Sequence, residues 1–193
     1  MILEIVFKEA THDCWLFSSE NSDQALSLKE VVKPFQCHSC PKFPEEHAIS
    51  RIGPDLAFET TKSCKAFITH DDWFIVGREI SESIRQYTNC KTVPVNKPET
   101  WFALLPEQYP VDIKVSGFEY SGVRCKSCGR WEEAVVGPLV GSIAMPEKHD
   151  LFWTSDVHNE SAKGARPRLW CKKSDKKKMY SLFDNSVKFD EAW

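Results

Sequence analysis

Two pairs of cysteines at CxxC spacing are the residues of this chain best suited to chemistry. One pair, Cys125 and Cys128, lies in the stretch GVRCKSCGR, and the other, Cys37 and Cys40, lies in FQCHSCPK. A CxxC turn lets both thiolates reach one zinc ion, and two such turns complete a tetrahedral shell of four sulfurs at about 2.3 Å from the metal. The sequence therefore predicts a shared Zn²⁺ site ligated by Cys37, Cys40, Cys125 and Cys128.

The two CxxC turns differ in the residue that follows them. Gly129 follows the second turn and supplies a positive φ without strain, whereas Pro41 follows the first and can neither adopt positive φ nor offer an N–H group. Three alternatives stay open: the thiols bind no metal, the two pairs form separate sites, or His38 or Cys171 replaces one ligand. A thioredoxin-like redox pair is less favoured, because neither CHSC nor CKSC precedes a convincing helix.

The predicted site joins two distant parts of the chain and has a structural role. Between Cys40 and Cys125 lie 84 residues, so residues 41–124 form a long insertion between the two knuckles. Loop-closure entropy grows only logarithmically with length, so an inserted fold can bring the ends together. A closed shell of four thiolates leaves the metal no open position for water. We expect a metal that joins the first third of the chain to its last third.

The other candidates for chemistry are weaker. Four cysteines have no CxxC partner and are expected to be small buried side chains: Cys14, Cys64, Cys90 and Cys171. The runs His70-Asp71-Asp72 and His149-Asp150 could each place a carboxylate beside a histidine, but such neighbours are common by chance. The motifs HExxH and GxSxG and the glycine loops that cradle phosphate are absent. The sequence therefore predicts a protein that is not an enzyme.

The composition indicates a packed globular chain. Of the 193 residues, 41% are hydrophobic and 12% aromatic, enough to bury a core without covalent staples. No uncharged apolar run is long enough to span a membrane, and the amino terminus lacks a signal-peptide pattern, so we expect a cytoplasmic protein with reduced thiols. We predict a single α+β domain over residues 1–193, and the composition gives no indication of oligomeric state.

Hydrophobic periodicity predicts several elements. Strands are expected at residues 2–7 and 14–17, and a short helix or irregular segment at 19–33. In REISESIRQY, residues 78–87, the side chains of Ile80, Ile84 and Tyr87 share one helical face.

Beyond this helix the signals are mixed. Four prolines in residues 92–110 predict a loop that leads to a strand at 111–118. Residues 150–153 are expected to form a short helix or a strand, residues 161–168 an exposed turn and residues 169–171 a buried strand.

Ser174 is expected to cap a final helix, whose apolar face has Met179, Leu182 and Phe183. The predicted fold class is α+β, with a mixed or antiparallel sheet and a zinc-ribbon-like site of four cysteines that joins the two knuckles.

Charge is unevenly distributed along the chain. The formal net charge is −3, but residues 1–60 have ten acids against five bases and residues 163–193 have nine bases against four acids. Seven bases near the carboxyl terminus could contact phosphates: Arg166, Arg168, Lys172, Lys173, Lys176, Lys177 and Lys178. A pI of about 6.1 argues against nucleic acid as a partner, so this stays an alternative.

The order of these features resembles the double-CxxCG family of bacterial immunity proteins. The features come in this order: a first CxxC near residue 40, a mixed α/β insertion, a CxxCG at 125–129, an acid-Leu-Phe element at 150–152, and a terminal strand and helix. The resemblance covers most of residues 35–185, and Cys125, Cys128 and Gly129 match the motif fully. Cys37 and Cys40 match it without the glycine.

The resemblance implies a function in binding. Family members are encoded beside secreted or contact-delivered toxins and protect the producing cell by binding the toxin. It therefore implies a zinc-stabilised immunity protein whose partner is a cognate protein toxin, with a zinc-ribbon nucleic-acid-binding or regulatory protein as the alternative. If the toxin is a nuclease, five acids could mimic phosphate: Glu20, Asp23, Glu30, Glu45 and Glu46.

Overall fold

The computed structural model describes the chain in several stretches. The described residues are 1–9, 16, 33–35, 37–40, 49, 53, 58, 64–69, 73–109, 118–127, 133–136, 147–155 and 168–191. The predicted strand at 14–17, apart from Leu16, and the predicted segments at 19–32, 111–117 and 161–167 lie outside these residues.

The larger sheet, which we call sheet A, joins the two ends of the chain. Its strands are β1 (Ile2–Phe7), β6 (Gln108–Tyr109), β9 (Phe152–Ser155), β10 (Leu169–Lys172) and β11 (Val187–Glu191), in the order β11-β1-β10-β9-β6. β1 runs antiparallel to both of its neighbours, and β6 runs parallel to β9, so the sheet is mixed. The strands predicted at residues 2–7 and 169–171 are confirmed, and residues 152 and 153 belong to a strand.

The second sheet, sheet B, is formed entirely by the insertion between the two CxxC turns. It contains β2 (Ala66–Ile68), β3 (Phe74–Gly77), β4 (Lys91–Pro94) and β5 (Trp101–Leu105), all antiparallel, in the order β2-β3-β5-β4. The loop predicted at residues 92–110 is therefore wrong. Pro94 is the last residue of β4, and β4 is an edge strand, where a proline removes no hydrogen bond from the ladder.

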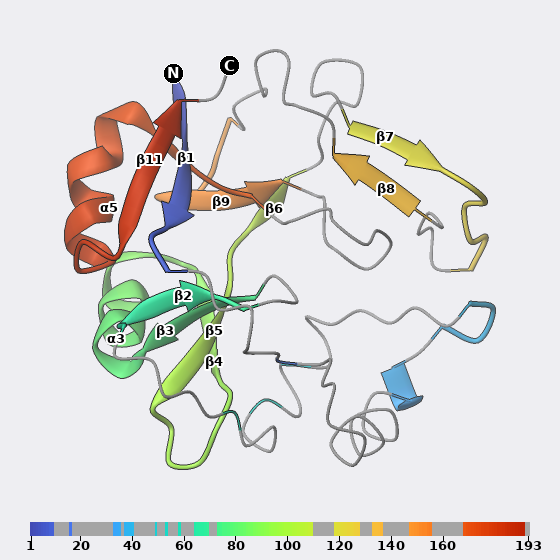
Figure 1. Ribbon diagram of the computed structural model, residues 1–193, viewed down its shortest axis with the longest axis horizontal. Helices are drawn as coiled ribbons and strands as arrows, with labels where there is room; N and C mark the ends of the chain where they lie inside the picture. The colour runs from blue at the N-terminus through green and yellow to red at the C-terminus, as the bar shows by residue number, and fades with distance from the viewer. Residues whose placement is uncertain are drawn as a thin grey trace.

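A third, two-stranded sheet leads to the second CxxC turn. β7 (Phe118–Ser121) pairs antiparallel with β8 (Glu133–Val136). Figure 1 shows this hairpin on the opposite side of the view from the two helices, while the 3-10 helix η1 (Lys33–Phe35) precedes the first CxxC turn.

The helix α3 (Arg78–Tyr87) has the bounds that the sequence predicts. Ile80 and Ile84 are buried, but Tyr87 is 63% exposed, so its predicted place on the inward face is wrong. Ser81 is buried instead, and its hydroxyl lies 2.9 Å from Thr92 Oγ1 of β4. The buried face is rotated toward Ser81 because a small side chain lets the helix approach this edge of sheet B.

The last helix, α5 (Lys176–Leu182), follows the 3-10 helix η3 (Lys173–Asp175). Ser174 lies within η3 and does not cap α5, whose N-cap is Asp175. Met179, Leu182 and Phe183 are buried as the spacing predicts. Asp184 and Asn185 have positive φ, and this turn leads into β11, which the sequence reasoning missed.

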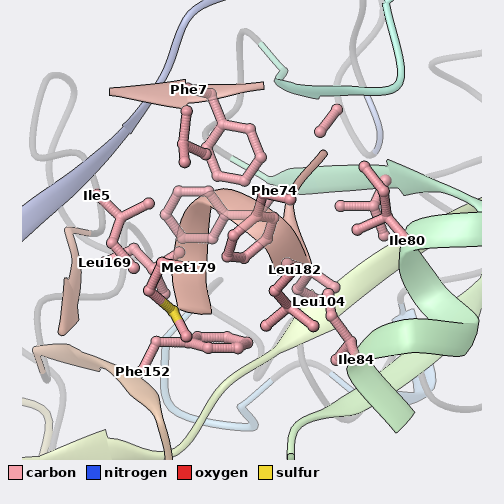
Figure 2. Close-up of a cluster of buried hydrophobic side chains, with 14 of the residues drawn as sticks. Ile5, Phe7, Phe74, Ile80, Ile84, Leu104, Phe152, Leu169, Met179 and Leu182 are labelled. Carbon is pink, nitrogen blue, oxygen red and sulfur yellow. The ribbon is translucent and has the colours of Figure 1, made fainter. Parts of the chain in front are cut away.

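Sheets A and B share one apolar core. Side chains from β1, β9, β10 and α5 pack with side chains from β2, β3, β5 and α3. Figure 2 shows Met179 and Leu182 of α5 in the same cluster as Ile80 and Ile84 of α3. The ring of Phe7 stacks on Phe74 across the two sheets, with 5.5 Å between centroids.

The other face of sheet B has its own cluster. Phe67, Ile75 and Ala103 pack there with Ile49 and Phe58, which precede the sheet in the chain. The predicted class, α+β with a mixed sheet, is confirmed. Neither of the two described helices has the length and apolar character needed to cross a membrane.

Candidate metal centre

Three of the four predicted ligands lie together. Cys37, Cys40 and Cys125 place their sulfurs within 4.8 Å of one another, and the sulfurs of Cys37 and Cys125 are 3.8 Å apart. The three side chains are half-buried, so the cluster lies near the surface. The two CxxC turns, which all of sheet B separates along the chain, thus lie together.

The first turn contains a backbone hydrogen bond to a cysteine sulfur. The backbone N–H group of Ser39 donates a hydrogen bond to Cys37 Sγ, with 3.4 Å between the atoms. Such a bond stabilises negative charge on the sulfur and fixes its direction. Pro41 lies outside the described residues.

The second turn is positioned by β7. Gly122 follows the last residue of β7 with φ 78°, a conformation that glycine adopts without strain. The chain thereby changes direction and reaches Cys125 three residues later. Figure 1 shows the loop after β7 close to the segment that contains residues 37–40.

A polar contact joins the two turns beside the sulfurs. Ser39 Oγ lies 2.7 Å from Ser127 Oγ, and Ser127 Oγ lies 3.3 Å from His38 Nε2. We call this contact of His38, Ser39 and Ser127 the serine clasp. Sequence reasoning missed it. The matching place of serine in CHSC and CKSC is a hint of equivalence between the turns, but it does not predict that they meet.

The two turns meet in equivalent positions. Cys37 contacts Cys125 and Ser39 contacts Ser127, and each pair is separated by 88 residues in the chain. The same separation joins Cys40 to Cys128 in the sequence. Cys128 and Gly129 lie outside the described residues, so the fourth predicted ligand is not placed.

The described sulfurs fit a metal ion. Two sulfurs bound at about 2.3 Å to one tetrahedral ion are about 3.8 Å apart. The Cys37 and Cys125 sulfurs have this separation, and the third sulfur lies within 4.8 Å of both. The three cysteines are therefore close enough to hold a metal ion.

The two substitute ligands lie elsewhere. His38 contacts Ser127 and is not part of the sulfur cluster. Cys171 is fully buried in β10, within the shared core.

The cysteines outside the cluster differ in burial. Cys90 and Cys171 are buried as predicted, and desolvation raises the pKa of each thiol to about 12. Cys64 is only half-buried, so its predicted burial is wrong: it precedes β2 at the start of sheet B. Cys14 lies outside the described residues.

The candidate His149-Asp150 pair is held by backbone contacts. The Asp150 carboxylate accepts hydrogen bonds from the N–H groups of Asn89, at 2.6 Å, and Leu151, at 2.8 Å. His149 Nδ1 donates to the backbone carbonyl of Asp150, and its ring lies 4.4 Å from that of Trp153. Asp150 thus connects the end of α3 to β9. His70, Asp71 and Asp72 lie outside the described residues.

Several bases near the carboxyl terminus have local partners. Lys173 pairs with Glu191 at 3.0 Å, and Lys178 pairs with Asp175 at 3.5 Å. Lys176 Nζ lies 5.4 Å from the centre of the Phe189 ring. These contacts neutralise part of the positive charge that the sequence places here. The acids proposed for phosphate mimicry, Glu20, Asp23, Glu30, Glu45 and Glu46, lie outside the described residues.

The chain matches no protein-family model, no curated protein and no solved structure.

Proposed function

We propose that this chain is a zinc-stabilised bacterial immunity protein that binds and neutralises a cognate protein toxin. The observation that carries the proposal is the gathering of Cys37, Cys40 and Cys125 from two CxxC turns on either side of a long insertion. The order of motifs along the chain supports the same family.

The proposed metal is Zn²⁺, with Cys128 as the fourth ligand. Thiolates are soft ligands, and a set of four favours zinc in a tetrahedral structural site. Positions that contact each other across the two turns are 88 residues apart, as Cys37 and Cys125 are. Cys40 and Cys128 have the same separation, which supports Cys128 as the fourth ligand. The proposed metal would hold residues 37–40 against residues 125–128.

A closed zinc site supports binding rather than turnover. Such a site fixes the backbone around it, and a surface that is already ordered loses less entropy when a partner binds. His38, Ser39 and Ser127 are exposed around the cluster, and Val123 is 76% exposed beside it. In this proposal the metal keeps the surface in shape and does not touch the toxin's chemistry.

Nucleic-acid binding has less support. A phosphate-binding face needs bases whose charge is available to the partner. Lys173, Lys176 and Lys178 instead contact acids or aromatic rings of the same chain.

Coexpression tests the proposed function. Cells that express the toxin encoded beside this gene are expected to survive when the protein is present, and the two proteins are expected to copurify one to one. Cys125→Ser should weaken protection, whereas Cys64→Ser, which removes a half-buried thiol outside the cluster, should not.

Two results would contradict the proposed function. Cell death at an unchanged rate without copurification would exclude immunity. Retention of the protein on nucleic acid, with a steep dependence on salt, would instead favour the alternative.

A further inference from the structure

We infer that Cys37 and Cys125 form a modification site, at which a two-electron oxidant such as hydrogen peroxide joins their sulfurs in a disulfide. This disulfide replaces the metal as the link between the two CxxC turns. The inference rests on the proposed metal centre and says how that centre is regulated. Oxidation releases the metal, and the disulfide keeps the two CxxC turns joined.

The positions of the two sulfurs favour this pair. They are 3.8 Å apart, in direct contact, and come from segments 88 residues apart. A disulfide has an S–S length of about 2.05 Å, so the sulfurs must approach by about 1.8 Å, which two surface turns can accommodate. Both side chains are half-buried, so a small oxidant can reach them.

The serine clasp also joins the two turns. Its contacts, Ser39 Oγ to Ser127 Oγ at 2.7 Å and Ser127 Oγ to His38 Nε2 at 3.3 Å, involve no sulfur. These contacts therefore do not depend on the metal, and they favour the approach of the two turns without fixing it. The clasp holds the two sulfurs within reach, which raises their effective concentration for coupling.

The two buried cysteines, Cys90 and Cys171, are poor substrates for the same oxidant. The thiolate is the reactive form, and burial raises the pKa of Cys90 and Cys171 to about 12, so both remain protonated at neutral pH. Cys64 is half-buried but lies outside the cluster. Burial therefore protects Cys90 and Cys171, and Cys64 is the half-buried thiol against which oxidation at the centre is compared.

The reaction balances in two steps. One of the two thiolates attacks the O–O bond of hydrogen peroxide and becomes a sulfenic acid, and the hydroxide that leaves takes a proton to form water. The second thiolate attacks the sulfenic sulfur, the S–S bond forms, and a second hydroxide leaves as water. Two thiolates lose two electrons, one peroxide becomes two waters, and two protons are consumed. Loss of two ligands frees the metal ion without a change in its charge.

The test uses the full chain loaded with zinc and treated with hydrogen peroxide. Zinc release is followed with a coloured chelator, and a non-reducing digest is mapped by mass spectrometry. The expected result is a peptide pair joined through Cys37 and Cys125 that appears in parallel with zinc release. Dithiothreitol with added zinc should reverse both.

Matched variants make the test specific. Cys125→Ser should abolish the cross-link, and Cys64→Ser should leave it unchanged. Ser39→Ala combined with Ser127→Ala should slow cross-link formation by about twofold to tenfold, because the clasp no longer holds the sulfurs close.

Two products would overturn the inference. One is a main disulfide between Cys37 and Cys40 within the first turn, and the other is oxidation to sulfinic acids without a disulfide. If the chain holds zinc and gives either product, this inference fails while the proposed function stands. If the purified chain binds no zinc, the proposed metal centre fails and takes the inference with it.

Discussion

The shared core and the cysteine centre differ in what holds them together. The core joins sheets A and B through apolar side chains from both sheets and both helices, and residues such as Ile84 and Phe183 have no exposed surface. The centre joins two turns through three half-buried sulfurs and a polar clasp. Burial of apolar area therefore stabilises the first region, whereas the second has only its cysteines and exposed polar contacts to join the turns.

This difference indicates separate tasks for the two regions. A core of this extent can fold the chain without metal, whereas segments linked by a few exposed polar contacts gain little from those contacts alone. We expect the centre to act as a local link on a chain that folds without metal. The predictions that follow test this division, from the largest effect to the smallest.

Phe183→Ala is expected to have the largest effect. The Phe183 ring lies 5.5 Å from the rings of both Phe7 and Phe152, so it connects α5 to two strands of sheet A. Truncation should lower the free energy of unfolding by about 3–5 kcal/mol, measured by urea denaturation. A loss below about 1 kcal/mol would show that the shared core is not packed as described.

Ile84→Ala and Tyr87→Ala form a matched pair on α3. Ile84 is fully buried, so its truncation should cost about 2–5 kcal/mol. Tyr87 is 63% exposed, and its truncation should change stability by less than about 0.5 kcal/mol. Equal effects at the two positions would mean that the inward face of the helix is assigned wrongly.

Removal of the metal is expected to have a smaller effect on stability and none on overall folding. At a free zinc concentration about one hundred times Kd, binding stabilises the native state by about 3 kcal/mol. A chelator should therefore lower the Tm, while circular dichroism still shows native secondary structure. Conversion of the chain to a random coil would show that folding requires the metal, and would contradict the separate tasks of the core and the cysteine centre.

Glu4 tests a polar contact inside sheet A. Its carboxylate pairs with Arg168 at 2.9 Å, but desolvation outweighs this pairing and raises the pKa of Glu4 above its ordinary value of 4.5. A raised carboxyl pKa means that the native state binds more protons than the unfolded state. The contribution of protonated Glu4 to stability is therefore complete below pH 4.5, and it is lost as the pH rises through the pKa that Glu4 has in the native state.

Glu4→Gln should remove this pH dependence. The variant is expected to equal or exceed the wild type in stability at neutral pH and to lose that advantage near pH 4, measured by thermal unfolding across the pH range. The effect should remain under about 1 kcal/mol, because partly exposed ion pairs contribute little. Marked destabilisation by Glu4→Gln at neutral pH would show that the Arg168 contact dominates.

Sequence patterns predicted the elements with a clear apolar run or repeat. β1 is an almost continuous short apolar run, α3 repeats Ile80 and Ile84 at helix spacing, and the structure has both elements at the predicted bounds. β4 and β5 were missed because prolines around them indicate loops, whereas Pro94 ends an edge strand and Pro106 follows β5. β11 was missed although Val187 and Phe189 alternate with charged residues after a turn of Asp184 and Asn185.

The candidate site was predicted in its ligand types but not in its contacts. CxxC spacing identified Cys37, Cys40 and Cys125, because two sulfurs of one turn can reach one ion. The approach of the two turns is a tertiary packing of segments 88 residues apart in the chain. No local pattern encodes such packing, so the clasp between Ser39 and Ser127 could not be derived from spacing alone.

Metal analysis of the purified full chain tests the central claim most directly. The four-cysteine centre predicts about one tightly held zinc per chain, lost in Cys125→Ser combined with Cys128→Ser and kept in the control Cys64→Ser. Less than about half an equivalent of zinc in the wild type, or full retention in the double variant, would contradict the centre.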